Sequence, residues 1–235
     1  MIVQKRGKGS LTYRSPGHRF KGRVKHAQAP KKTIKGHIVD FMHCPGHSAP
    51  LAQIRYEDGE EVLMFAPEGV KVGDFVQIGP EAKIMPGNIC QLKNIPEGTA
   101  IYNIELQPGD GGKFCRASGA FGRVVSKMGN KVIVRLPSKR EKTFNKECRA
   151  CVGVIAGGGR TEKPFLKAGT KMKAMRARNK LYPITSAGAM NALSHPFGNT
   201  RSLRKSKARP IPRNAPPGRK IGMIAAKRTG RRKRK

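Results

Sequence analysis

Two motifs have residue types and spacings that could bind a metal ion. Cys148 and Cys151 have the two-residue spacing of a zinc knuckle, and His43, Cys44 and His47 could complete a tetrahedral site. Against this, the second cysteine runs directly into an expected β-strand. Zinc is therefore the weaker interpretation of these five side chains, and no metal and no cofactor is expected, apart from structural cations bound through RNA.

A histidine and a glycine run could support other chemistry. His195 has no neighbouring carboxylate or nucleophile in the sequence, so it is a poor candidate for acid–base catalysis. The run 157–160, Gly-Gly-Gly-Arg, could cradle phosphate with its backbone N–H groups, but it lacks the Lys-Ser/Thr ending of a P-loop and a following helix pattern. A glycine turn pressed on RNA backbone is favoured over a turn that contacts protein alone. No catalytic residue is expected.

The charge of the chain indicates a polyanionic partner. The 235 residues include 49 Lys and Arg against 14 Asp and Glu, a formal net charge of +35. Such a surplus is self-repelling in an isolated globule and is typical of nucleic-acid binding. The sequence shows no membrane-spanning stretch and no secretory leader, and its five cysteines are irregularly spaced. We therefore expect a reducing, cytoplasmic location and no membrane partner.

The basic residues are concentrated at the two ends of the chain. Residues 1–35 contain eleven Lys and Arg, residues 171–235 contain twenty, and neither stretch contains an acid. The middle, 36–170, has a net charge of only +4. The ends are rich in Pro and Gly and show no usable periodicity, so they are expected to order against a partner. Four aromatic residues within them could stack on unpaired bases or anchor the ends on protein: Tyr13, Phe20, Tyr182 and Phe197.

The middle of the chain predicts two small β units. The stretches 36–42, 51–56, 61–66, 70–73 and 75–79 read as five short strands with turn signals between them, including Asp58-Gly59. A five-stranded oligonucleotide-binding (OB) barrel is the natural candidate. A second set, 98–106, 122–127, 131–136, 142–145 and 152–156, predicts a small SH3-like barrel with a hairpin at 128–130. The chain is thus expected to be mainly β, with a basic extension at 1–35, an OB-fold domain at 36–86, an SH3-like domain at 87–170 and a basic extension at 171–235.

Several motifs together resemble one family. They are Arg14-Ser15-Pro16-Gly17-His18-Arg19, Pro45-Gly46-His47-Ser48, Arg116-Ala117-Ser118-Gly119, the glycine run 153–160, Gly188 to Gly198, and Pro217 to Arg231. In this combination, which runs nearly end to end, the chain resembles the universal ribosomal protein L2 family of the large subunit, and archaeal members in particular. It departs from the family pattern at Ala192, Ser194 and Asn199, which affects the loop around His195.

The resemblance implies an OB barrel, then an SH3-like barrel and a long extension, all bound to large-subunit rRNA. It also implies a place near the peptidyl-transferase region, support of subunit assembly and association, and contacts with neighbouring ribosomal proteins and with the small subunit. His195 matches a histidine that the family links to peptidyl transfer, but we expect it to contact rRNA or to pack the loop.

The residues expected to bind RNA are mostly basic and lie mainly in the two ends. They are Arg14, Arg19, Lys21, Arg23, Arg116, Arg160, Lys163, Lys167, Arg176, Arg178, Asn179, Lys180, Met190, Asn191, His195, Arg201, Arg204, Lys205, Arg213, Arg219, Lys220, Lys227, Arg228 and Arg231. Two alternatives remain: a general nucleic-acid chaperone, which would bind duplex DNA equally well, and an RNA-modifying enzyme, which would need paired acids, a cofactor loop or a metal cluster.

Overall fold

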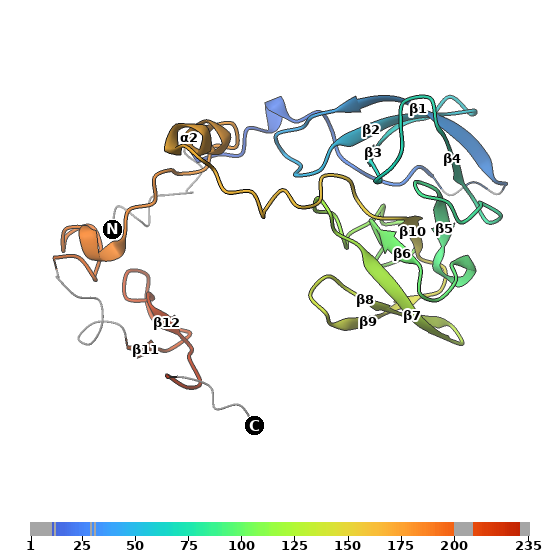
Figure 1. Ribbon diagram of the computed structural model, residues 1–235. Helices are drawn as coiled ribbons and strands as arrows, with labels where there is room; N and C mark the ends of the chain where they lie inside the picture. Colours follow the sequence, from blue (N-terminus) through green and yellow to red (C-terminus); the bar gives the residue numbers. More distant parts are fainter. Residues whose placement is uncertain (1–10, 12, 29, 31, 200–208, 231–235) are drawn as a thin grey trace. The chain divides into compact units, whose positions relative to one another are not determined.

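The structure, a computed structural model, describes residues 11, 13–28, 30, 32–199 and 209–230 (Figure 1). These residues belong to two units, each described here by itself. One is Gly17–Pro164, and the other combines Met1–Pro16 with Phe165–Lys235. No helix in these ranges is long and apolar enough to cross a lipid bilayer.

The unit Gly17–Pro164 begins with four strands that form the first barrel. They are β1 (Ile34–Met42), β2 (Leu51–Tyr56), β3 (Glu61–Phe65) and β4 (Phe75–Ile78). β1 pairs with both β2 and β4, and a bulge between Ile38 and Asp40 bends it. The β2–β3 hairpin closes at Gly59, whose φ of +86° is a left-handed conformation that glycine adopts at little cost.

Six further strands complete the same sheet. They are β5 (Ile89–Gln91), β6 (Ala100–Tyr102), β7 (Gly122–Met128), β8 (Lys131–Arg135), β9 (Glu141–Asn145) and β10 (Arg149–Val152). The spatial order is β3-β2-β1-β4-β5-β10-β6-β7-β8-β9. β4 and β5 meet in parallel through the single pair Ile78 and Ile89, and β10 lies between β5 and β6. Short 3-10 turns occupy Gly17–Arg19 and Leu92–Asn94.

Two hydrophobic cores lie under this sheet. Leu51, Phe65 and Tyr102 belong to the first core, and Val134 and Phe144 belong to the second. The chain after β10 returns to the first barrel, where the N–H of Glu68 donates to the carbonyl of Val154 at 2.8 Å and Ile155 is fully buried. Each core therefore depends on segments that are far apart in sequence.

The fold is mainly β, and its pattern agrees with the predicted OB barrel followed by an SH3-like barrel. Seven predicted strands match observed ones to within two residues at each end: β1, β2, β3, β4, β7, β8 and β9. Both predicted hairpins, at 58–59 and 128–130, are present. The bounds of the predicted domains stay a prediction.

Three predicted strands were wrong in place or extent, and one observed strand was not predicted. Residues 70–73 form turns, because Lys71 and Asp74 close on each other through backbone and side-chain hydrogen bonds. The strand predicted at 98–106 is limited to Ala100–Tyr102, since Asn103 has a φ of +48°. The strand predicted at 152–156 lies earlier, at Arg149–Val152, and β5 was not predicted.

Residues 20–27, within the unit Gly17–Pro164, pack against the first barrel. Val24 and Ala27 are buried in the first core, and Gly46 approaches the ring of Phe20 closely enough that a Cβ there would lie 3.0 Å from it. The basic composition of residues 1–35 gave no indication of this contact. Phe20 therefore anchors its segment on protein.

The other unit contains one helix and short turns. α2 (Ala168–Arg176) has Lys167 as its N-cap residue, which makes no side-chain capping hydrogen bond, and its first turn contains no acid, so the usual start signals of a helix are missing from the sequence. The sequence thus shows no helix pattern after the glycine run, and α2 was not predicted. A 3-10 turn at Ala187–Ala189 follows, and β11 (Pro210–Ile211) pairs in parallel with β12 (Met223–Ile224).

Candidate RNA interface

The segment around α2 presents cations without nearby acids. Lys167, Arg176, Arg178 and Lys180 are exposed. Asn179 follows the helix with a φ of +50°, and its side-chain N–H donates to the carbonyl of Arg14 at 2.8 Å. The amide of Asn179 thus ties residue 14 to the end of α2, while the exposed ammonium and guanidinium groups remain available to phosphate.

The loop that contains His195 is closed by its own hydrogen bonds. The N–H of Phe197 donates to Nδ1 of His195 at 3.0 Å, and the N–H of Asn199 donates to the carbonyl of Met190 at 2.8 Å. The imidazole also contacts the Phe197 ring edge-on at 5.4 Å between centroids. Because Nδ1 accepts a hydrogen bond, the neutral imidazole carries its proton on Nε2. His195 therefore offers a donor, and the side chain of Asn191 is exposed beside it in the loop.

The aromatic residues of the ends have different environments. Phe197 packs against Gly222, where a Cβ would lie 3.1 Å from its ring, so it joins the His195 loop to the last segment of the chain. Lys171 Nζ lies 5.5 Å from the centroid of Tyr182. Tyr13 lines a cavity of about 390 Å³ with Met172 and Tyr182. Phe20 and Phe197 are anchors on protein, whereas base stacking by Tyr13 and Tyr182 stays a prediction.

The remaining predicted contacts divide into outward and inward side chains. Those that are exposed are Arg14, Arg19, Lys21, Arg23, Arg160, Lys163, Arg213, Arg219, Lys220, Lys227 and Arg228. Arg116 is half-buried, and its guanidinium donates to the carbonyls of Gly112 and Val24 at 2.9 Å each. Four predicted residues, Arg201, Arg204, Lys205 and Arg231, lie outside the described residues. The RNA-binding role of every one of these residues stays a prediction.

A buried ion pair between Arg149 and Glu105, which sequence reasoning missed, holds the segment around Ala27 on the barrels. Arg149 donates to Glu105 through Nη2 at 2.8 Å and through its backbone N–H at 2.8 Å, and Nη1 donates to the carbonyl of Ala27 at 2.7 Å. Burial raises the pKa of Glu105, but the hydrogen bonds and charge of Arg149 outweigh it, so the net shift is downward. This pair joins β10, the 103–112 loop and the N-terminal segment.

His26 completes this network in its neutral form. Its Nε2 donates to the carbonyl of Asn103 at 2.7 Å, and the Cys151 sulfur lies 3.8 Å from Nδ1. Burial lowers the pKa of His26 to about 4, despite the opposing charge of Glu105. The charged groups of this network are buried and hydrogen-bonded, as in a structural element, and no signal in the sequence marked it.

The five candidate zinc ligands are not brought together. Cys44 and Cys151 lie in the first core and Cys148 lies in the second, while His43 is exposed. Nδ1 of His47 contacts the Cys44 sulfur at 3.2 Å. Among the described residues, no group of three or more His, Cys, Asp or Glu side chains could hold a metal ion. Burial also raises the pKa of Cys148 to about 11, which disfavours the thiolate that zinc requires.

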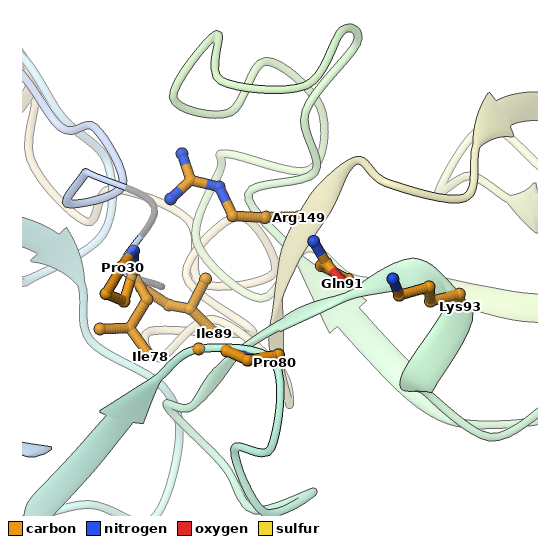
Figure 2. A pocket seen from close by; sticks show the side chains of 8 residues that line it. Pro30, Ile78, Pro80, Ile89, Gln91, Lys93 and Arg149 are labelled. Carbon is orange, nitrogen blue, oxygen red and sulfur yellow. The ribbon is translucent and has the colours of Figure 1, made fainter. Parts of the chain in front are cut away.

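A cavity of about 270 Å³ lies at the junction of β4 and β5 (Figure 2). Ile78, Ile89, Pro30 and Pro80 form apolar walls, and Figure 2 shows the head groups of Arg149 and Lys93 at opposite ends of the lining. The guanidinium is already bound in the network with Glu105. Of the described residues that line it, none is a Ser, Thr, Cys, His, Asp or Glu. Its described lining therefore offers no hydroxyl, thiol, imidazole or carboxylate group for catalysis.

The balanced charge of the middle of the chain conceals two opposite halves. Residues 36–110, the acidic segment, contain four Lys and Arg and eleven Asp and Glu, a net charge of −7. Residues 111–170, the basic segment, contain fourteen Lys and Arg and three Asp and Glu, a net charge of +11. From 111 to 140 there are eight Lys and Arg and no acid. The basic segment is therefore a third cationic stretch, which was missed when residues 36–170 were counted together.

Comparison with known proteins gives consistent matches along the chain. The family model described as Ribosomal Proteins L2, RNA binding N-terminal domain, matches residues 4–78, and the model described as Ribosomal Proteins L2, C-terminal domain, matches residues 85–216. The large ribosomal subunit protein uL2 of Methanothermobacter thermautotrophicus is 47% identical over 237 residues, which cover 99% of this chain and 98% of the relative.

Two further archaeal relatives carry the same name. The protein of Archaeoglobus fulgidus is 48% identical over 230 residues, covering 98% of this chain and 97% of its own length. The protein of Haloarcula marismortui is 49% identical over 229 residues, which cover 97% of this chain and 95% of the relative. The similarity therefore extends over both barrels and both basic ends.

Proposed function

The chain belongs to the ribosomal protein L2 family of the large subunit, and on this premise we propose how it acts. Its cationic segments bind large-subunit rRNA, and this binding supports subunit assembly and association and the architecture near the peptidyl-transferase region. The observation that carries the proposal is the similarity to large-subunit proteins over 99% of the chain. The resemblance of the motifs around His195 and Gly218 supports the location.

Phosphate neutralisation is the main source of affinity in this proposal. The two ends contain 31 Lys and Arg and no acid, and Arg19, Arg178 and Lys220 are typical in being exposed. Each such cation that meets a phosphate releases condensed counterions, so binding is strong and sensitive to salt. The acidic segment is unsuited to this role, which assigns the RNA contacts of residues 4–78 to the basic stretch before Gly36.

His195 acts as a hydrogen-bond donor to RNA through Nε2. Its Nδ1 is occupied by the N–H of Phe197, and Nε2 carries the proton. A donor at this position fits a phosphate oxygen, a 2′-OH or a base acceptor. We assign the chain a structural role, in which neighbouring ribosomal proteins and the small subunit are further partners and structural cations are held by the rRNA. Its place is the cytoplasmic ribosome.

The salt dependence of binding tests the proposal. The full chain is titrated with a large-subunit rRNA fragment at several salt concentrations, with duplex DNA as competitor. Each phosphate neutralised contributes about −0.7 to −0.9 to the log–log slope, so we expect a steep slope. A slope near zero would contradict the electrostatic account. Equal competition by duplex DNA would favour a general nucleic-acid chaperone.

Proteolysis gives an independent test of the basic ends. Segments of like charge with few apolar residues gain order from a polyanion. We expect trypsin to cut 171–235 rapidly in the free chain and slowly in the large subunit. Equal cutting in both would show that the segment makes no ordered contact with RNA. The barrel unit Gly17–Pro164 is the internal reference.

A further inference from the structure

A cavity of about 350 Å³ opens on the basic segment where β7 begins. It is lined by Phe121, Arg123, Arg135, Leu136 and Pro137, together with Gly119 and Ala120 of the preceding turn. Its volume lies in the range of small-ligand sites. The ring of Phe121 is 37% exposed, and Leu136 is half-buried. Two cations and a group of apolar side chains therefore meet at one exposed hollow.

The two arginines of this cavity lie directly opposite each other. Arg123 on β7 is the register partner of Arg135 on β8, and Arg135 is in turn the partner of Glu141 on β9. Like charges in such a position repel each other. Glu141 binds Arg135 at 3.0 Å, and none of the ion pairs among the described residues includes Arg123. The three side chains of Arg123, Arg135 and Glu141 therefore carry one positive charge in excess, and Arg123 is exposed.

The surroundings select the kind of partner that fits. From residue 111 to residue 140 there is no acid, so an anionic ligand meets no repulsion from this stretch. The exposed ring of Phe121 offers a flat apolar face. Every nucleic-acid base has a π-face that can stack on it, whatever the base sequence. A phosphate alone would leave that face bare, whereas a nucleotide uses both the ring and the guanidinium.

We propose that this cavity binds one unpaired nucleotide of rRNA, with its base stacked on Phe121 and its phosphate at Arg123. The inference rests on the proposed function and adds a defined contact outside the two basic ends. A base in a continuous duplex cannot reach the ring, so the site distinguishes unpaired from paired RNA.

Crosslinking in the assembled particle tests the contact directly. Large subunits that contain the full chain are irradiated with short-wavelength ultraviolet light, and the peptides that carry a nucleotide are identified by mass spectrometry. We expect an adduct on the Phe121 peptide, its loss in Phe121→Leu, and its retention in Phe121→Tyr. Phe75 on β4 is the matched control, because it is 76% exposed but lies in the acidic segment, and it should carry no adduct.

The outcomes separate this inference from the function on which it rests. Adducts on peptides of the basic ends without one on the Phe121 peptide would overturn the nucleotide site and leave rRNA binding intact. Absence of adducts from every peptide of the chain would overturn both. An adduct on the Phe75 peptide that equals the one at Phe121 would also overturn the site, because exposure alone would then explain it.

Binding of short RNA to the full chain provides a second measurement. Phe121→Leu should weaken binding of an oligouridylate about tenfold and leave binding of a paired RNA duplex unchanged, since stacking on one base contributes about 1–3 kcal/mol. Arg123→Gln should lower the salt slope for the single strand by about 0.7, whereas Phe121→Leu should not change it. Phe75→Leu should change neither. Equal affinities of the wild type and Phe121→Leu for the oligouridylate would overturn the proposal.

Discussion

The acidic segment (36–110) carries a net charge of −7 and the basic segment (111–170) carries +11, yet strands of both pair in one ten-stranded sheet. Their buried residues are of the same kind, and each segment contains a tight hairpin. Core packing and turn chemistry therefore determine the fold, while the exposed positions are free to take either charge. From this difference we expect the phosphate contacts of this unit to concentrate on the basic segment and on the chain before Gly36.

The ion pairs of the described residues show how the two segments are joined. Arg55–Glu61 lies within the acidic segment and Arg135–Glu141 within the basic one, and both pairs are exposed. Glu105–Arg149 is the third, and it links the two segments while almost fully buried. The acidic and basic segments are thus joined by one buried ion pair, between Glu105 and Arg149.

Loss of that buried pair should have the largest effect. Arg149→Met leaves the Glu105 carboxylate without its charge partner, and breaking a buried pair from one side costs about 3–5 kcal/mol. We expect the free energy of unfolding of the full chain, measured with urea and tyrosine fluorescence, to fall by that amount. Arg55→Gln, in the exposed pair, should cost about 1 kcal/mol or less. Equal losses of unfolding free energy in the two variants would show that the buried pair is worth no more than the exposed one.

Acidification should weaken the same junction through His26. Its pKa is about 4 in the folded chain and 6.5 when unfolded, so the unfolded state binds more protons between these values. Stability is therefore complete above pH 6.5 and falls on acidification, by about 2 kcal/mol between pH 7 and pH 5. The Glu105 contribution is lost only below its ordinary pKa of 4.5, outside this window. His26→Gln, compared with the wild type by urea unfolding at both pH values, should lack this loss.

RNA affinity should distinguish the two segments by a smaller amount. Lys131 on β8 and Lys71 before β4 are both exposed, but the first lies in the basic segment. Lys131→Gln should reduce the salt slope for rRNA by up to about 0.9, and Lys71→Gln should leave it unchanged. A larger change at Lys71 would show that phosphate contacts are not concentrated as the charges suggest.

The smallest effects should be equal in the two segments. Gly59 and Gly129 close the β2–β3 and β7–β8 hairpins with φ values of +86° and +54°, and a Cβ at either would meet no atom. Alanine should therefore cost only the strain of a left-handed backbone, about 1 kcal/mol at each site. Thermal unfolding of the two variants measures this. A clear difference would mean that one hairpin is supported by contacts that the other lacks.

The sequence predicted strands that local signals define. Residues 51–56 and 131–136 contain β-branched or aromatic residues next to a Gly-containing turn, and strands form at Leu51–Tyr56 and Lys131–Arg135. β5 has three residues and is held by β4 and by β10, which comes 58 residues later, so no local pattern reveals it. α2 lacks a cap and acidic residues in its first turn, and for this reason its start carries no signal.

The positive charge of the candidate interface was predictable from the sequence, but which of its side chains point outward and which turn inward was not. The acid-free ends follow from counting, and the exposure of Arg176 and Lys220 agrees with it. Composition could not show that Arg116 turns inward to two carbonyls, because that depends on Val24 and Gly112 coming together. The pairing of Arg123 with Arg135 likewise depends on the register of two strands.

The return of residues 154–156 to the first barrel has a consequence for synthesis. The carbonyl of Ala66 lacks the N–H of Ala156, and the N–H of Glu68 lacks the carbonyl of Val154, until about ninety further residues have left the ribosome that is making the chain. The first barrel thus emerges early but closes only when the second is nearly complete. Each core contains a residue of β10, Cys151 in the first and Val152 in the second, so neither is complete before that strand is made, and the cationic stretch 171–235 is synthesised after it.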